Sequence, residues 1–344
     1  MQQRSFILVA ATVALLIVGA VAAYAYDSSR DDLIAKGVTV AGVDVGGMNV
    51  ADARGKLRRE AVGPLERPVT VVYGQRRFLL TARQAELRAD VQAMVDEALS
   101  KSRDGTIVSR VTRDITGGWE DAQVPARVHY SRPAVIALVN RVKKAVDRPA
   151  QNARLRFPSL AKVKERNGVA VQAGALQQRV EQALTVPGVG RRVEPLVTVT
   201  KPKISRDELA NHYPTLIVIQ RSAFRLTLYK HLRRVHSYTI AVGQLGLETP
   251  AGLYHVQNKA VNPAWSVPNS AWAGSLAGTV IPGGTPENPL KARWLGIFDG
   301  AGIHGTDQLG SLGTAASHGC IRMAIPDVIA LYKRVPVGAP VYVA

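Results

Sequence analysis

One cysteine and two histidines lie in a short segment near the C-terminal end of the chain. The segment HGTDQLGSLGTAASHGC begins at His304 and ends at Cys320, with His318 two residues before the cysteine. Cys320 is the only cysteine among 344 residues, so the chain cannot close a disulfide within itself. A cysteine reacts as the thiolate, and a neighbouring base or cation lowers its pKa. We therefore expect an ionised, nucleophilic thiol beside one of the histidines, although spacing alone does not decide which one.

Three other interpretations of these residues can be compared with the sequence. A lone cysteine is often a buried and unreactive side chain. A zinc site built from His304, His318 and Cys320 would use ligands that zinc prefers, but this segment lacks the usual ligand spacing and a fourth donor. A papain-like protease has its cysteine near the mature N-terminus and its histidine far downstream, which is the reverse of the order here. We therefore expect no metal and no cofactor.

The residues around the cysteine predict further parts of a site. Gly319 permits backbone conformations that turn consecutive N–H groups toward one point. Such groups stabilise the oxyanion of a tetrahedral intermediate, by about 3 kcal/mol per donor. Arg322 follows the cysteine by two residues, and a guanidinium can bind a carboxylate through two parallel hydrogen bonds.

The N-terminal segment predicts where this chemistry takes place. Phe6–Tyr26 carries no charge and is long enough to cross a bilayer, which takes about 20 apolar residues. Arg4 precedes the segment and acidic residues outnumber Arg30 just after it, so we expect the rest of the chain outside the cytoplasm. Ala23-Tyr24-Ala25 resembles a cleavage site, which makes a removed signal peptide and a secreted protein the alternative. Secretory apolar segments run only about 7 to 15 residues, so we favour a transmembrane anchor over residues 1–27.

The charge of the chain indicates its surroundings. The 44 basic and 26 acidic residues give a formal net charge of +18. Export removes nucleic acid as a partner, and no basic run is interleaved with aromatic residues as base stacking requires. Anionic polymers of the cell envelope or lipid head groups are the expected counter-charge.

Residues 30–205 are predicted to form one or two small α+β modules. Asn49 is expected to cap a helix whose third residue is Asp52, and residues 69–81 alternate as a hairpin that turns at Gly74-Gln75. Three amphipathic helices are expected over 90–101, 133–146 and 174–184, and a strand over 196–200. These modules contain no paired histidine, cysteine or carboxylate cluster.

Residues 213–344 are predicted to form a second, β-rich domain. Short apolar runs such as TLIVIQ, FRLTLYK and VHSYTIAVG at close spacing predict a sheet-dominated fold. Residues 262–293 interrupt that rhythm with a long segment rich in proline and glycine, and such a segment is often a functional loop. Trp265 and Trp272 favour an ordered flap over a disordered loop, because disordered segments are poor in aromatic residues.

At these residues the chain resembles a known family. The segment GIHGTDQLGSLGTAASHGCIRM is similar to the signature of the L,D-transpeptidases, cysteine enzymes that cross-link peptidoglycan, and AVGQLGLETPAGLYHV and NPAWSVP precede it in the expected order. The resemblance is to a YkuD-type catalytic domain. The preceding residues resemble the peptidoglycan-binding modules of envelope enzymes, although a spacer that binds nothing is the alternative. The expected architecture is therefore α+β, with a sandwich-like catalytic domain of mixed sheet after the modules and one transmembrane helix.

The resemblance implies a role for each candidate residue. Cys320 would be the nucleophile, His304 its base and later its acid, and the carbonyl of Gly305 would fix the imidazole tautomer. The roles implied for the remaining residues concern the turn and the substrate: His318, Ser317 and Gly319 would shape the turn and oxyanion site, and Arg322, Tyr254 and Trp265 would bind substrate.

The implied reaction is acyl transfer without metal or nucleotide. The thiolate would attack the carbonyl carbon of the third residue of a tetrapeptide stem, expel D-alanine and form a thioester. An amine of a neighbouring stem would then attack the thioester and form a 3→3 cross-link. The thiol would also be open to acylation by carbapenems. Two alternatives remain: an L,D-carboxypeptidase, which passes the acyl group to water, and a wall-binding protein with a vestigial catalytic domain.

Overall fold

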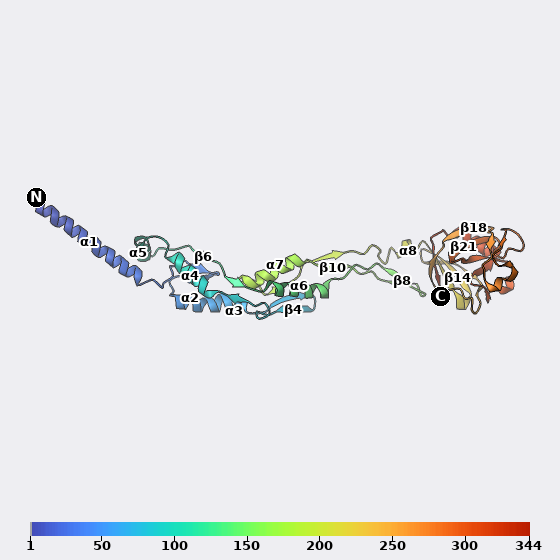
Figure 1. Ribbon diagram of the computed structural model, residues 1–344, viewed down its shortest axis with the longest axis horizontal. Coiled ribbons are helices and arrows are strands. Elements are labelled where there is room, and N and C mark those ends of the chain that lie inside the picture. The colour runs from blue at the N-terminus through green and yellow to red at the C-terminus, as the bar shows by residue number, and fades with distance from the viewer. Residues whose placement is uncertain (1) are drawn as a thin grey trace. The chain divides into compact units, whose positions relative to one another are not determined.

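The computed structural model describes residues 2–344 and the side-chain surroundings of residues 7–344 (Figure 1). The chain forms two compact units. The first runs to Pro149 and includes Gly168–Thr200, and the second combines Ala150–Asn167 with Lys201–Ala344. Helices and short sheets occur in both units, which confirms the α+β fold class. Arg4, used to predict the orientation of the N-terminal segment, lies outside the residues whose side chains are described.

The chain begins with one long apolar helix. Helix α1 covers Gln2–Ser28, and its stretch Ile7–Ser28 has the length and composition of a membrane span. A signal sequence has the same properties, so the helix supports both interpretations of this segment. Most of its described side chains are exposed, as for Leu15 at 75%, while Ala23, Tyr26 and Asp27 near its end are half-buried.

The first unit contains two separate hydrophobic cores. In the first core, Asn49 caps α2 by accepting a hydrogen bond from the N–H of Asp52, as predicted. Val91, Met94, Val95 and Ala98 form the buried face of α4, which packs against α2. The elements around this core are β1 (Thr39–Val40), β2 (Val43–Asp44), α2 (Val50–Leu57), η1 (Arg58–Val62), α4 (Val91–Ser102) and β6 (Gln123–Val124). Helices α3 (Gly63–Leu65) and α5 (Ile107–Thr116) contribute no residue to it.

The second core lies between two helices and a small sheet. The predicted hairpin is present, with β3 and β4 joined at Gly74-Gln75, and β11 pairs with β3 in parallel. Leu138 and Leu176, from two helices, are completely buried in this core. Its elements are β3 (Val69–Tyr73), β4 (Arg76–Leu80), β5 (Arg88–Ala89), β7 (Val128–His129), α6 (Arg132–Val146), β10 (Gly168–Val171), α7 (Ala173–Thr185), β11 (Arg192–Val193) and β12 (Val197–Thr200).

The second unit is built on two sheets that enclose its main core. The five-stranded sheet has the order β15-β14-β13-β25-β17, and β13 pairs with β25 in parallel while the other pairs are antiparallel. Every residue from Thr215 to Ile219 is buried, as expected for a central strand. The strands are β13 (Thr215–Gln220), β14 (Arg225–Lys230), β15 (Arg233–Thr239), β17 (Gly252–His255) and β25 (Pro340–Val343).

The four-stranded sheet has the order β18-β21-β22-β24. Its last pair, β22 and β24, is parallel, and helix α9 follows β24 directly and packs against β21, β22 and β24. Side chains of both sheets and of α9 share one core, which gives the expected sandwich-like arrangement of mixed sheets. The elements are β18 (Asn258–Val261), β21 (Arg293–Phe298), β22 (Ala301–Thr306), β24 (Ile321–Ala324) and α9 (Ile325–Arg334).

The second unit also takes in a hairpin from the middle of the chain. Strands β8 (Arg154–Arg156) and β9 (Ala161–Val163) pair within Ala150–Asn167. Leu155 packs there against Leu209, which lies on the short helix α8 (Leu209–His212). We did not anticipate this hairpin, because its short strands alternate charged and apolar residues over too few positions to give a clear pattern.

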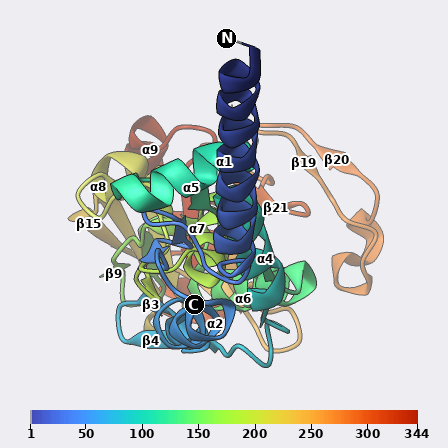
Figure 2. The same ribbon diagram turned by 90° about the vertical axis from the view of Figure 1, so that its left-hand side faces the viewer.

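The long segment between β18 and β21 folds into an ordered flap. Strand β19 (Trp265–Ser266) pairs with β20 (Val280–Ile281), and the 3₁₀ helix η3 (Ala271–Leu276) lies between them (Figure 2). The side chain of Asn288 is completely buried and donates hydrogen bonds to the carbonyls of Pro263 and Pro282. These bonds fasten the two ends of the flap to each other.

We expect Leu331→Ala on α9 to lower the free energy of unfolding of the second unit by about 2 to 5 kcal/mol, because it leaves a cavity beneath the four-stranded sheet. Urea unfolding followed by tryptophan fluorescence measures the change. Val337→Ala is the matched control, because Val337 is 57% exposed and should cost little. Equal stabilities of the two variants would contradict the assigned core.

Candidate active site

The register of two strands places the candidate residues on one side of the sheet. In the parallel pair β22–β24, His304 lies opposite Arg322 and Ile303 opposite Ile321. Successive side chains of a strand point to opposite faces. Because Ile303 and Ile321 are fully buried in the core, the side chains of His304 and Arg322 point away from it.

Cys320 stands directly before β24 and continues this pattern. It lies two residues before Arg322, and the backbone N–H of Gly302, two residues before His304, stabilises the thiolate form of Cys320. The cysteine is free and partly exposed. It is therefore accessible to a ligand.

A cavity of about 1,120 Å³ opens on this face of the sheet. His304, Ser317, His318, Cys320 and Arg322 all line it. One wall is the flap, which contributes residues of Pro263–Pro268 together with Ser270 and Trp272. Trp265 is among these flap residues, so the cavity brings it together with the candidate catalytic side chains.

The imidazole of His304 is buried and held by the backbone. Its Nδ1 lies 2.7 Å from the carbonyl oxygen of Gly305, so the neutral ring carries its proton on Nδ1 and leaves Nε2 as an acceptor. Trp294 lies opposite His304 on β21 with its ring stacked at 6.3 Å. Burial lowers the pKa of His304 to about 4, against the opposing effect of the Gly305 and Pro289 carbonyls and with a further lowering by the charge of Arg322.

The expectation of an ionised thiol is wrong for the resting site. Burial raises the pKa of Cys320 above its ordinary value, although the Gly302 N–H and the charge of Arg322 act in the opposite direction. With the pKa of His304 near 4, both groups are neutral at pH 7. From these states the proton must pass from sulfur to ring before the sulfur attacks or as it does so.

The turn before the cysteine is held by its own side chains. Ser317 Oγ donates a hydrogen bond to the carbonyl of Cys320 at 2.6 Å and accepts one from the N–H of Gly319 at 3.3 Å. Gly319 has φ of +109°, a conformation that side chains with a Cβ rarely adopt. The sequence Ser-His-Gly-Cys therefore specifies a tight turn that ends at the sulfur.

Thr249 fastens this turn to a neighbouring strand. Its hydroxyl is fully buried, donates to the carbonyl of Gly319 at 2.9 Å and accepts from the N–H of Gly243 at 3.0 Å. Gly243 lies on β16 (Val242–Gly243), which pairs with β23 (Ala315–Ser317). The TPAGLY motif thus acts on the turn through its threonine.

Two other candidate side chains have partners that sequence spacing did not suggest. The ring of His318 stacks on Trp272 of the flap, with centroids 4.1 Å apart and planes at 7°. Arg322 donates from Nη1 to Oε1 of Gln308 at 3.0 Å. Gln308 therefore orients the guanidinium, and the stack connects the turn to the flap.

Tyr254 is not brought to the cavity. Its ring stacks on Phe298 at 4.8 Å, and its hydroxyl donates to the carbonyl of Ala251. We did not single out Trp294 or Gln308 in advance. A tryptophan at the position opposite the histidine becomes visible only once the pairing of β21 with β22 is known.

The site defines a class of chemistry. Residues 7–344, whose side chains the structure describes, contain no cluster of three histidine, cysteine or acidic side chains that could hold a metal, so the zinc interpretation lacks a ligand set there. What the cavity offers is a partly exposed thiol, a buried neutral base and a guanidinium. This combination is suited to nucleophilic acyl transfer.

Comparison with known proteins identifies the two parts of the chain. Residues 214–343 match the family model "L,D-transpeptidase catalytic domain", named YkuD, and residues 79–187 match "Putative peptidoglycan binding domain". The resemblance of residues 214–343 to an L,D-transpeptidase catalytic domain is therefore confirmed.

Curated relatives carry the same family name. "Putative L,D-transpeptidase YqjB" of Bacillus subtilis is 39% identical over 31% of this chain and 57% of its own length. "Putative L,D-transpeptidase YkuD" of the same species is 35% identical over 37% of this chain and 65% of its own length. The chain thus spans less than two thirds of these relatives.

The chain is also similar to a solved structure. The NMR structure of the catalytic domain from E. faecium L,D-transpeptidase is 25% identical, with a TM-score of 0.32, over 38% of this chain and 98% of that one.

We expect Thr249→Val to destabilise the second unit by about 1 to 3 kcal/mol, because it leaves the Gly243 N–H and one acceptor of the Gly319 carbonyl buried without a partner. Thr249→Ser keeps the hydroxyl and serves as the control. Thermal unfolding of both variants measures the effect. If valine and serine behaved alike, the hydroxyl would have no role in holding the turn.

Proposed function

We propose that this protein is a membrane-anchored peptidoglycan L,D-transpeptidase that forms 3→3 cross-links with Cys320 as its nucleophile. The observation that carries the proposal is the register of β22 with β24, because it gives Cys320 and His304 the same face and the same cavity. The family match over residues 214–343 supports the reaction class. We propose the substrate and the roles of the single residues as part of the same hypothesis.

The cavity is the proposed binding site for the stem peptide. A tetrapeptide stem ends in a carboxylate, and Arg322, held by Gln308, is the cation that lines the cavity beside the cysteine. Trp265 and Trp272 give the flap apolar surface that can cover a bound stem. Covering the stem would exclude water, which competes with the acceptor amine for the thioester.

Acylation begins from two neutral groups. As the sulfur of Cys320 bonds to the carbonyl carbon of the third stem residue, its proton passes to Nε2 of His304. The carbonyls of Gly305 and Pro289 favour the imidazolium that results. When the amide bond breaks, this imidazolium returns the proton to the departing D-alanine nitrogen, which leaves a thioester on Cys320 and a neutral ring.

Deacylation reverses these roles. The side-chain amine of a neighbouring stem gives a proton to His304 and bonds to the thioester carbonyl. The C–S bond breaks, the sulfur recovers a proton from the ring, and the new amide is the 3→3 cross-link. Backbone N–H groups near the Ser317–Cys320 turn are the candidates for binding the oxyanion in both steps.

The remaining parts are proposed to place this chemistry in the envelope. The match over residues 79–187 supports peptidoglycan as the polymer that the first unit contacts. The apolar helix α1 supports a membrane anchor with the catalytic domain outside the cytoplasm, or a secreted enzyme if the helix is removed.

The test is incubation of the protein with tetrapeptide-stem muropeptides and mass spectrometry of the products. We expect 3→3 dimers and released D-alanine from the native chain and neither from Cys320→Ala. His304→Ala should slow dimer formation by about 10²- to 10⁴-fold, which is the usual contribution of a general base to the reaction rate. His255→Ala is the control, because His255 lies exposed on β17 and does not line the cavity.

Two outcomes would overturn the proposal. Release of D-alanine without dimers would make the protein an L,D-carboxypeptidase. Binding of muropeptides without any product, under conditions where Cys320 reacts with a thiol reagent, would leave a wall-binding protein with a vestigial catalytic domain.

A further inference from the structure

Helix α5 has an apolar face on which Val108 and Ile115 are exposed, while Ile107 and Val111 are half-buried against the described part of the first unit. Ile107, Val108, Val111 and Ile115 lie within about 100° of one another around the helix, at 100° per residue. Val108 and Ile115 are each 70% exposed. Trp119, just beyond the end of the helix, is also 70% exposed. Arg110 and Arg113 lie on another side, so the helix is strongly amphipathic.

The polar side of α5 is bound to the end of α1. Arg110 donates to both carboxylate oxygens of Asp27, from Nε at 2.8 Å and from Nη2 at 2.6 Å. Both side chains are mostly buried, at 16% and 14% exposure. Asp27 is the penultimate residue of the apolar stretch Ile7–Ser28. A side-chain ion pair therefore links α5 directly to the point where α1 would leave a bilayer.

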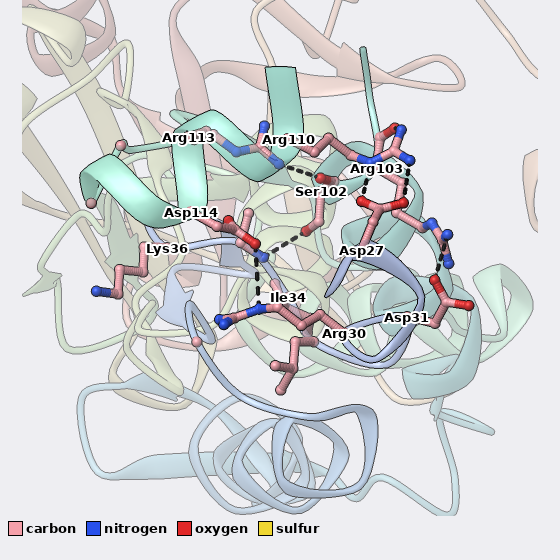
Figure 3. Close-up of a pocket in the computed structure, with 15 residues that line it drawn as sticks. Asp27, Arg30, Asp31, Ile34, Lys36, Ser102, Arg103, Arg110, Arg113 and Asp114 are labelled. Carbon is pink, nitrogen blue, oxygen red and sulfur yellow. Dashed lines mark hydrogen bonds and ion pairs between the residues drawn. The ribbon is translucent and has the colours of Figure 1, made fainter. Parts of the chain in front are cut away.

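Further ion pairs surround this point. Arg103 pairs with Asp31 at 2.6 Å and Arg30 with Asp114 at 3.3 Å, around a small polar cavity (Figure 3). Arg113 donates to the carbonyl of Ser102 at 2.6 Å, which ties α5 to α4. We call these three ion pairs, Arg110–Asp27, Arg103–Asp31 and Arg30–Asp114, the collar. Two pairs of the collar connect the residues at the end of α1 to α5, and Arg103–Asp31 connects them to the end of α4.

The two helices cross instead of running side by side. In Figure 2 the axis of α5 lies across that of α1, and the two helices are in contact. A helix that crosses a membrane span at its exit runs along the bilayer surface. This orientation suits a helix with one apolar and one charged side.

We propose that α5 lies in the head-group layer of the membrane, with Val108, Ile115 and Trp119 inserted among the lipids and the collar holding it against α1. The proposal rests on the membrane anchoring proposed above. It makes the lipid surface a second binding partner of the first unit and fixes that unit's orientation at its point of attachment.

The bilayer fits this face better than a protein does. Tryptophan and tyrosine are enriched at membrane interfaces, and Tyr24 on the last turns of α1 is exposed at 64% on the same end of the helix as the collar. The apolar side chains are few, which suits shallow insertion. The basic side chains of the collar are all paired with acids, so insertion of apolar groups and not charge attraction is the expected driving force.

The test uses the fact that Cys320 is the only cysteine. In a Cys320→Ala background, Ile115→Cys is labelled with an environment-sensitive fluorophore, and the full chain is reconstituted into phosphatidylcholine and phosphatidylglycerol vesicles. Lipids with a spin label near the head group should quench this fluorophore several-fold more than aqueous iodide does. Thr116→Cys is the matched control, because the next residue is exposed, polar and turned by about 100°. It should be quenched mainly by iodide.

A label at Leu15→Cys, within α1, separates the two proposals. If lipid quenches Leu15 but treats Ile115 and Thr116 alike, the anchor holds and the inference about α5 is overturned. If lipid quenches none of the three positions, the membrane anchoring fails and the inference with it. Shielding of Ile115 from both lipid and iodide would show a protein contact and would also overturn the inference. Arg110→Gln should reduce lipid quenching at Ile115 and leave it unchanged at Leu15.

Discussion

The hydrogen-bonded register between β22 and β24 places His304 and Arg322 on the same side of the sheet, and Cys320 stands directly before β24. One residue of slip would turn His304 into the core and Ile303 toward the cavity, because side chains alternate along a strand. The full burial of Ile303, Ile321 and Met323 opposes such a slip. The catalytic proposal thus depends on apolar side chains that never touch a substrate.

Burial has a second consequence, which is electrostatic. It disfavours both charged forms at once, so the pKa of the thiol rises while that of His304 falls to about 4. A histidine in an unfolded chain has a pKa near 6.5, so between about pH 6.5 and 4 the unfolded state binds more protons than the folded one. Stability therefore falls through that window as the pH decreases. The same burial keeps the His304 ring neutral, and therefore able to act as a base, at every pH well above its pKa of about 4.

Local signals predicted much of the fold, and tertiary contacts supplied the rest. The Asn49 cap, the hairpin at Gly74-Gln75 and the buried face of α4 follow from neighbouring residues alone. The cavity residues were found because motif and spacing mark them. The state of the thiol was predicted wrongly, since desolvation by distant segments has no local signature. Tyr254 lies in a recognisable motif, but the stacking on Phe298 that keeps it from the cavity depends on the fold.

The central claim, a neutral thiol beside a neutral imidazole, is tested most directly by the pH dependence of Cys320 alkylation with iodoacetamide, which reacts with the thiolate. Because Cys320 is the only cysteine, the rate belongs to this residue alone. We predict a rate that is low at pH 7 and still rising with pH beyond 9, with no plateau near neutrality. A rate that rises through an apparent pKa below 7 and stays constant from there to pH 8 would reveal a resting thiolate–imidazolium pair and contradict the account.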